Sequence, residues 1–110
     1  MLRSSLIALT SQLAHVVSSA YVQDPLALDH RGYSAGSFHD MTRVACLDPA
    51  VWTDLFFSNR EPLLAVLDGL IARLGTYRAA LASSDEAAMH ALLAAGREAR
   101  LKVADTFISR

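Results

Sequence analysis

The sequence predicts an all-α fold of about four main helices, with one long functional loop between the first helix and the second. Three observations favour this fold class. Apolar residues recur at alternating spacings of three and four, which is the period of an amphipathic helix. Hydrophobic residues make up 53% of the chain but aromatic residues only 7%, a balance typical of alanine- and leucine-rich helices. The 110 residues suffice for one domain and not comfortably for two, so residues 1–110 are interpreted as a single helical domain.

Residues 2 to about 22 are predicted to form the first helix. One face carries a stripe of mostly large apolar residues: Leu2, Leu6, Leu9, Leu13, Val16 and Ala20. Roughly opposite lies a stripe of small residues and one histidine: Ser4, Ala8, Ser11, His15 and Ser18. This second stripe could be a solvated back face, but such faces normally carry Lys and Glu, and this helix has neither. The composition therefore favours a buried or pocket-lining face.

The next segment, residues 24–40, is predicted to be irregular, because Asp24-Pro25, Gly32 and Gly36 are typical turn residues. A loop of this length inside a compact domain is more often functional than not.

Asp48-Pro49 then marks a strong helix start, with Asp as the N-cap and Pro at the first helical position. We expect this helix to end at Ser58-Asn59.

The rest of the chain is predicted to form two long antiparallel helices joined by a short turn. The first has a regular apolar stripe: Leu63, Leu67, Leu70, Leu74, Tyr77 and Leu81. The second runs from about Asp85 to Phe107. Each is preceded by a pair that resembles a capping box, Ser58 with Glu61 and Ser83 with Glu86.

Composition excludes several classes of function. A net charge of −1 gives no electrostatic grip on nucleic acid or an anionic membrane. Cys46 is the single cysteine, so an internal disulfide is excluded and a reduced, cytoplasmic setting is favoured. Polar residues interrupt the apolar N-terminal segment before it reaches the roughly 18 apolar residues of a membrane span. The apolar excess of so short a chain instead indicates a surface buried against a partner.

No motif for a cofactor or a metal is visible. A Gly-rich phosphate loop after a strand is absent from the sequence, so no NAD or ATP site is predicted in this chain. The four histidines are scattered and none has zinc-ligand spacing with cysteine. Cys46 is interpreted as a small core residue.

Three side chains stand out as candidates for binding a ligand. Arg43 suits a carboxylate because its planar fork makes two parallel hydrogen bonds, although it could instead be a surface residue or a structural ion-pair partner. His15 could donate a hydrogen bond to an anionic or hydroxylated ligand, or it could be a boundary histidine satisfied by a serine. Trp52 is most simply a core or interface anchor, given Phe56 one turn later.

These separate signals follow one order along the chain. The relevant residues are Ser11-Gln12-Leu13-Ala14-His15, then Gly36-Ser37-Phe38-His39-Asp40-Met41-Thr42-Arg43, then Asp48-Pro49-Ala50-Val51-Trp52-Thr53-Asp54 and Asn59. The order resembles the C-terminal domain of bacterial prephenate dehydrogenases, with its Ser-His-Leu-Pro-His helix, Gly-Gly-Phe-x-Asp-x-Thr-Arg loop and Asp-Pro-x-x-Trp-x-Asp helix. The two long helices extend the likeness to nearly the whole chain.

The resemblance implies roles for particular residues. Arg43 matches the arginine that holds a substrate carboxylate, and His15 matches the histidine that faces the ring end of the substrate. Ser11 begins the helix motif, Gly36 belongs to the loop that closes over the pocket, and Trp52 matches a tryptophan near the site. Gln12 takes the place of the first histidine and is assigned to the same pocket, where it can hydrogen-bond but cannot titrate near neutral pH. Ala14 for proline and Ser37 for glycine are further departures from the pattern.

The family also implies what this chain lacks. NAD or NADP and the catalytic histidine belong to an N-terminal Rossmann domain, which is absent here, so no catalytic residue is expected in this chain. The sequence looks cut at, or inside, an interdomain helix, as in a fragment, a proteolytic product or a split gene. We expect an intertwined homodimer, and possibly a separate Rossmann-domain polypeptide as a partner.

The leading hypothesis is the substrate-binding and dimerisation domain of a prephenate or arogenate dehydrogenase-like enzyme of tyrosine biosynthesis, with the isolated chain inactive. An alternative is a stand-alone helical dimerisation or regulatory module without catalytic activity, which Gln12, Ala14 and Ser37 favour slightly. A third is a small helical enzyme of the chorismate mutase type. Such sites need several cations converging on two carboxylates, and the basic residues here are spread thinly.

Overall fold

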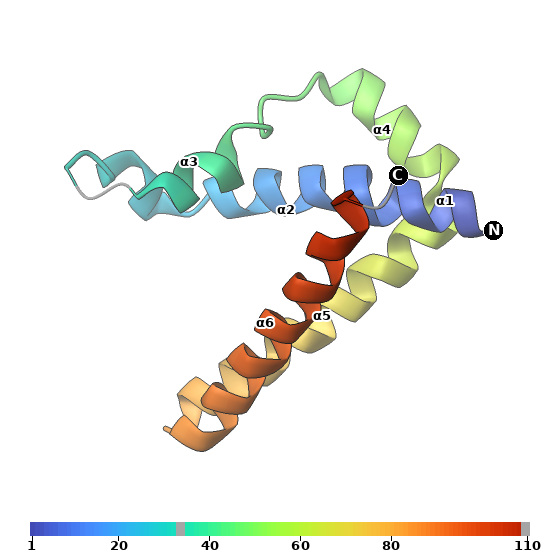
Figure 1. Cartoon of the computed structure of the whole chain (residues 1–110). Helices are drawn as coiled ribbons and strands as arrows, with labels where there is room; N and C mark the ends of the chain where they lie inside the picture. The colour runs from blue at the N-terminus through green and yellow to red at the C-terminus, as the bar shows by residue number, and fades with distance from the viewer. Residues whose placement is uncertain (33–34, 109–110) are drawn as a thin grey trace. The chain divides into compact units, whose positions relative to one another are not determined.

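The computed structural model of the chain describes residues 1–32 and 35–108, and these residues form helices and connecting turns without a strand (Figure 1). The all-α prediction is confirmed. The chain divides into two compact units, Met1–Gly69 and Leu70–Arg110, so each is described by itself.

The first helix of the unit Met1–Gly69 is continuous from Leu2 to Val22 but changes its winding. It comprises α1 (Leu2–Ile7), a π-helical turn η1 (Ala8–Gln12) and α2 (Leu13–Val22). At the end of η1 the backbone N–H of Leu13 donates to the carbonyl of Ala8, five residues back. Single π turns inside α-helices occur frequently at functional sites.

The two stripes of the first helix are arranged as the composition indicated. In the small-residue stripe, Ala8 and Ser18 are buried and the other three residues are half-buried. In the leucine stripe Leu13 is buried as well, but Leu6 and Leu9 are each 49% exposed. The small-residue stripe is therefore the more buried of the two, in line with the prediction of a buried or pocket-lining face. Small side chains there permit close approach of neighbouring elements.

By length and composition alone, the first helix could also cross a membrane, with a mean hydropathy of 1.2. The indication is weak, since a signal sequence near the N-terminus or a core helix meets the same test. Gln12 in the middle of this helix is 6% exposed and hydrogen-bonded to α4, as described below.

The prediction that residues 24–40 are irregular is wrong for two parts of that segment. Residues Pro25–Asp29 form the 3-10 helix η2, because the Asp24 carboxylate accepts a hydrogen bond from the backbone N–H of Leu26 at 2.9 Å. Asp24-Pro25 therefore starts a helix in the same way as Asp48-Pro49 does. Residues 33 and 34 of the segment lie outside the described residues.

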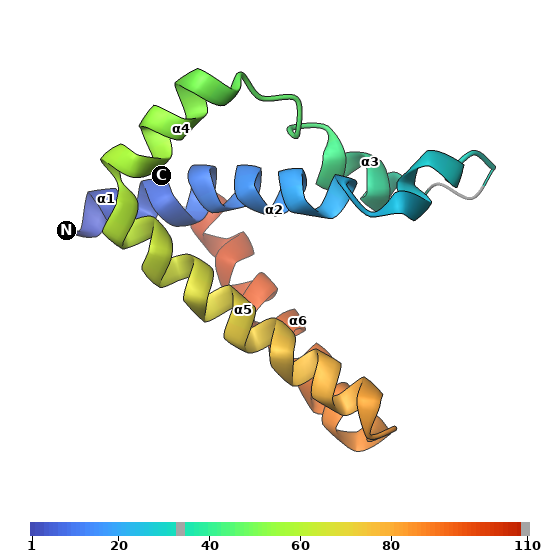
Figure 2. The same cartoon turned by 180° about the vertical axis from the view of Figure 1, so that it is seen from behind.

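A further helix, α3 (Gly36–Thr42), occupies the end of the predicted loop and packs on α2 (Figures 1 and 2). Its N-cap, Ala35, makes no side-chain cap hydrogen bond, so the sequence lacks the usual start signal. Phe38 packs its ring 6.1 Å from that of Tyr21 on α2, and this tertiary contact helps to stabilise the short helix. Thr42 is the last residue of α3, and its hydroxyl donates to the carbonyl of Phe38.

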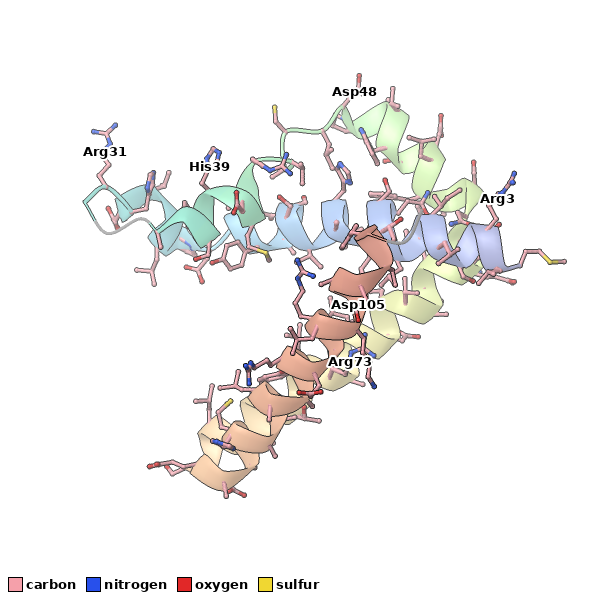
Figure 3. All side chains as sticks on the ribbon, viewed as in Figure 1. Arg3, Arg31, His39, Asp48, Arg73 and Asp105 are labelled. Carbon is pink, nitrogen blue, oxygen red and sulfur yellow. The ribbon has the colours of Figure 1, made fainter. Side chains whose placement is uncertain are left out.

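The next helix, α4 (Pro49–Ser58), begins as predicted. The Asp48 carboxylate accepts hydrogen bonds from the backbone N–H groups of Ala50 and Val51, at 2.9 and 3.3 Å. Figure 3 shows Asp48 at this start. The helix gives way at Asn59, also as predicted, and α5 (Arg60–Ala82) follows directly.

The unit Leu70–Arg110 is an antiparallel helical hairpin, made of the later part of α5 and α6 (Glu86–Ile108), which lie side by side (Figures 1 and 2). The turn contains Ser84 with a positive φ of 55°. Asp85 caps α6 by accepting from the backbone N–H of Ala88 at 2.9 Å.

Both predicted capping boxes are wrong in detail. Ser83 donates to the carbonyl of Ala79 and Ser58 to that of Asp54, so neither hydroxyl caps the following helix. A serine in a last helical turn is satisfied by the carbonyl four residues back.

The described residues enclose a very small core. In the ranges 1–32 and 35–107, whose burial is described, the buried apolar residues are Ala8, Leu13, Leu63 and Ala80. Many large apolar side chains are exposed instead, including Leu81 and Phe107 at 71% and 69%. Such an excess of exposed apolar surface is unusual for a monomeric soluble domain.

Candidate functional site

Four of the six predicted ligand-binding residues meet where the first helix lies against α4. Ser11, Gln12 and His15 come from the first helix, and Trp52 comes from α4. Because Ser11 and His15 are one helical turn apart, they share a face. The π turn η1 ends between them, at Gln12.

The imidazole of His15 stacks on the indole of Trp52. The ring centroids are 4.4 Å apart and the ring planes are inclined by 23°. Phe56 extends the aromatic surface along α4, with its centroid 5.7 Å from that of Trp52 and a tilt of 58°. Trp52 and His15 are both half-buried, so this aromatic surface is accessible at its edge.

His15 is oriented by its own helix. Its Nδ1 lies 2.7 Å from the backbone carbonyl oxygen of Ser11, and because a carbonyl can only accept, Nδ1 carries the proton. Nε2 is then free to accept a hydrogen bond in the neutral ring, or to donate one in the imidazolium. Ser11 therefore contributes its carbonyl to the histidine, and its hydroxyl makes no hydrogen bond within the described residues.

Gln12 and Asn59 form a second cluster beside this stack, which we call the amide cluster. Gln12 donates from Nε2 to the carbonyl of Leu55 at 3.1 Å. Asn59 donates from Nδ2 to Oε1 of Gln12 at 2.8 Å and to the carbonyl of Ser4 at 3.0 Å. Both ends of the Gln12 amide are thus engaged within the protein, and its side chain is only 6% exposed.

The other two predicted residues lie at the two ends of α3. Gly36 is the first residue of α3, where a Cβ would meet no atom within 4 Å. Arg43 is the C-cap, and its backbone N–H donates to the carbonyl of His39 at 3.0 Å. The Arg43 side chain is exposed and forms no ion pair with the described residues, so its guanidinium is available to an external anion.

The structure gives no contact between Arg43 and the His15–Trp52 stack. Arg43 forms no ion pair with Asp40 or Asp54, two carboxylates of the predicted motifs. His39, which is exposed, points away from α3 (Figure 3). Cys46, predicted as a small core residue, is exposed, and the core interpretation is therefore wrong.

A cavity of about 670 Å³ lies beside α3, between the end of α2 and η2. Its aromatic lining comes from Tyr21, His30 and Phe38, with His30 and Phe38 centroids 5.2 Å apart. No single sequence motif predicts this cavity, because its lining residues come from three elements.

Sequence reasoning also missed the part that Asn59 plays. The sequence predicts Asn59 as the residue that ends α4 and as part of the motif order, and an asparagine after a helix usually suggests a cap. Its contacts with Ser4 and Gln12 span 55 and 47 residues, and nothing in local spacing indicates them. Among the described residues, no group of three or more His, Cys, Asp or Glu could hold a metal ion.

Comparison with known proteins gives one consistent result. Residues 4–95 match the family model described as "Prephenate dehydrogenase, dimerization domain". The chain is 41% identical over 85 residues to a cyclohexadienyl dehydrogenase of Zymomonas mobilis, covering 72% of this chain and 29% of that protein. It is 26% identical over 80 residues to a prephenate dehydrogenase of Bacillus subtilis, covering 68% of this chain and 22% of that protein. The chain thus spans less than a third of the length of these curated relatives.

Proposed function

The chain belongs to the prephenate dehydrogenase family, in which it corresponds to the dimerization domain, and on this premise we propose that it is the substrate-binding and dimerisation part of a prephenate or arogenate dehydrogenase-like enzyme. The match to that family model over residues 4–95 carries the proposal. The whole enzyme would act in tyrosine biosynthesis in the cytoplasm. It would oxidise the ring alcohol of its substrate with NAD or NADP and release the ring carboxylate as carbon dioxide.

In this proposal the described residues contribute binding and orientation. The exposed guanidinium of Arg43 would hold a substrate carboxylate through two parallel hydrogen bonds. His15 would present Nε2 to the polar ring end of the substrate, while Trp52 supports the imidazole from behind. Holding the substrate in one orientation can lower the activation free energy of a reaction considerably, even where the reacting groups lie elsewhere.

The residues described do not fit a nicotinamide dinucleotide. Such cofactors are bound where a strand turns through a Gly-rich loop into a helix, and residues 1–32 and 35–108 contain no strand. We therefore assign the cofactor and the hydride transfer to a Rossmann domain outside this sequence. No catalytic step is derived from the present chain.

Dimerisation is supported by the distribution of apolar surface. Exposed leucines line the face of the first helix opposite the small-residue stripe, and exposed apolar residues also lie on α5 and α6. A second copy of the chain would cover such surfaces, and obligate dimer interfaces are typically apolar. We propose a homodimer on this ground.

Isothermal titration calorimetry of the purified chain with prephenate tests the binding role. Measurable binding with one site per chain is expected, and parallel assays with prephenate and NAD should show no reduction of NAD. Turnover by the pure chain would contradict the division of labour between this chain and a Rossmann domain. Absence of binding would favour the alternative of a dimerisation or regulatory module without a ligand site.

That alternative is favoured by one observation. Gln12 stands where the family has a histidine, and both ends of its amide are used within the protein. A chain that had lost its ligand would retain such structural contacts. The Arg43 variants described in the Discussion distinguish the two possibilities.

A further inference from the structure

The contacts between the first helix and α4 follow a simple order. Asn59 bonds to Ser4, Gln12 bonds to Leu55, and His15 stacks on Trp52. As the first helix proceeds from residue 4 to residue 15, its partner residues therefore descend from 59 to 52. The two helices run antiparallel along this line.

The hydrogen bond between Gln12 and Leu55 lies next to the aromatic stack of His15 and Trp52. On each of the two helices, the two contacts are about one helical turn apart. His15 follows Gln12 by three residues, and Trp52 precedes Leu55 by three residues. Residues three apart on a helix are neighbours on its surface. A hydrogen bond that fixes Gln12 opposite the Leu55 carbonyl therefore also fixes which part of α4 His15 faces.

Gln12 is in turn held by Asn59. The Asn59 amide donates to Gln12 Oε1 at 2.8 Å, which fixes the orientation of the Gln12 amide so that its NH₂ group points at the Leu55 carbonyl. The second bond from Asn59, to the Ser4 carbonyl, ties the end of α4 to α1. Asn59 sits between α4 and α5 with φ −126° and ψ 35°, so its side chain anchors the junction of these helices.

We propose that Asn59 is a positioning residue: through Gln12 it sets the register of α4 against the first helix and so holds Trp52 in stacking contact with His15. Among the described residues, the ring of His15 has two contacts that orient it: the stack on Trp52 and the hydrogen bond to the Ser11 carbonyl on its own helix. The relevance of this stack to substrate binding rests on the proposed function, whereas the coupling itself does not.

Trp52 provides a direct test, because it is the only tryptophan in the chain. Time-resolved fluorescence of the full chain would separate stacked and unstacked populations of Trp52, with His15→Ala defining the unstacked signal. The variants are Asn59→Ala and, as a matched control, Ser58→Ala. Ser58 is the neighbouring residue, is exposed, and bonds only to the carbonyl of Asp54 in its own helix.

We expect Asn59→Ala to lower the ratio of stacked to unstacked Trp52 about fivefold, the effect of losing the hydrogen bond to Gln12, which is the one of its two bonds that acts on the stack. Ser58→Ala should leave the ratio unchanged. The effect of His15→Ala on the Trp52 signal should be smaller in the Asn59→Ala background than in the native chain. The two effects overlap because both residues act on the same contact. Helix content by far-UV circular dichroism should remain native in all variants.

A native Trp52 signal in folded Asn59→Ala would overturn the proposal, since a purely structural asparagine would lower stability without altering the stack. If Asn59→Ala does not fold, Gln12→Met keeps the length of the side chain but removes both the acceptor for Asn59 and the donor to Leu55. A native Trp52 signal in Gln12→Met would equally overturn it. Neither readout involves prephenate, so failure here leaves the proposed function untouched, and failure to bind prephenate leaves this inference untouched.

Discussion

Arg43 is the exposed cation on which the proposed function depends most. It lies at the C-cap of α3, and its guanidinium has no ion-pair partner among the described residues. A structural arginine would be expected to have such a partner. An exposed arginine that binds no ligand could be replaced without effect on binding, whereas replacing a ligand-binding arginine would weaken binding measurably.

We predict that Arg43→Ala weakens prephenate binding by about 10- to 100-fold, the range expected for losing hydrogen bonds to a charged group. Arg43→Lys should recover only part of this loss, because an ammonium group cannot make the two parallel bonds of a guanidinium. Isothermal titration calorimetry checks both. Arg31→Ala, another exposed arginine of the same unit, is the control, and equal losses in Arg31→Ala and Arg43→Ala would point to a general charge effect.

The sequence was most informative where local chemistry decides the structure. Asp48-Pro49 predicted the start of α4 because a carboxylate cap and a proline act within one turn. The same dipeptide at Asp24-Pro25 predicts a turn, yet there it starts the 3-10 helix η2. Local sequence could not predict the contacts of Asn59, because its acceptors lie on the first helix and only the folded chain brings them together.

At the level of the helices, caps, tertiary contacts and glycines determine how stable each helix is. α4 has an explicit cap in Asp48, whereas α3 depends on the contact between Phe38 and Tyr21. α5 and α6 carry Gly75 and Gly96 in their interiors, which lowers their intrinsic helix stability. Each of these features predicts a measurable change in stability.

We predict that Asp48→Ala lowers the free energy of unfolding by about 1 kcal/mol, the usual effect of removing an N-cap carboxylate. Urea unfolding followed by circular dichroism measures the change. Asp54→Ala serves as the control, because Asp54 is an exposed carboxylate within α4 whose side chain caps nothing. Equal effects of both substitutions would contradict the capping role.

Gly75→Ala is predicted to stabilise the chain by up to about 1 kcal/mol, because alanine has the higher helix propensity. A Cβ at Gly75 would meet no atom within 4 Å, so no clash offsets the gain. At Gly96 the added Cβ would lie 3.8 Å from the Tyr77 hydroxyl oxygen, an ordinary contact, and the gain should be similar. Thermal unfolding of both variants tests this, and a loss of stability at Gly96 alone would show that Tyr77 cannot accommodate the added Cβ.

At the scale of the whole molecule, the chain is richer in exposed apolar surface than in buried core. The spacing predicts the leucine stripe of the first helix. Of its large members only Leu13 is buried, while Leu6 and Leu9 are about half exposed, and Ala8 and Ser18 of the small-residue stripe are buried. Periodicity correctly located both stripes. It could not tell which one faces inward within a single chain, because that depends on which elements pack against the helix.

We predict that the chain is a dimer at micromolar concentration and that Leu9→Glu weakens dimerisation by at least about 100-fold, because an unpaired carboxylate is costly to bury. Sedimentation velocity over a range of concentrations measures this. Thr10→Glu adds the same charge at the next residue, which is exposed, and should have a smaller effect. A soluble, well-folded monomer of the native chain would count against the dimer.

The π turn η1 has a geometric consequence for the first helix. Successive residues of an α-helix are rotated by about 100°, so residues eight apart differ by about 80° and residues seven apart by only about 20°. Because the π turn adds one residue to the helical path, Ser4 and Gln12 are aligned almost as if seven apart, and one asparagine reaches both. Deleting a single residue of η1 would restore regular winding and keep this alignment, because the two residues would then be truly seven apart. Regular α winding at the present length would instead turn everything before η1 by about 100° and separate Ser4 from Gln12. The π turn thus keeps Ser4 and Gln12 in phase although the helix has one residue more than regular winding would need.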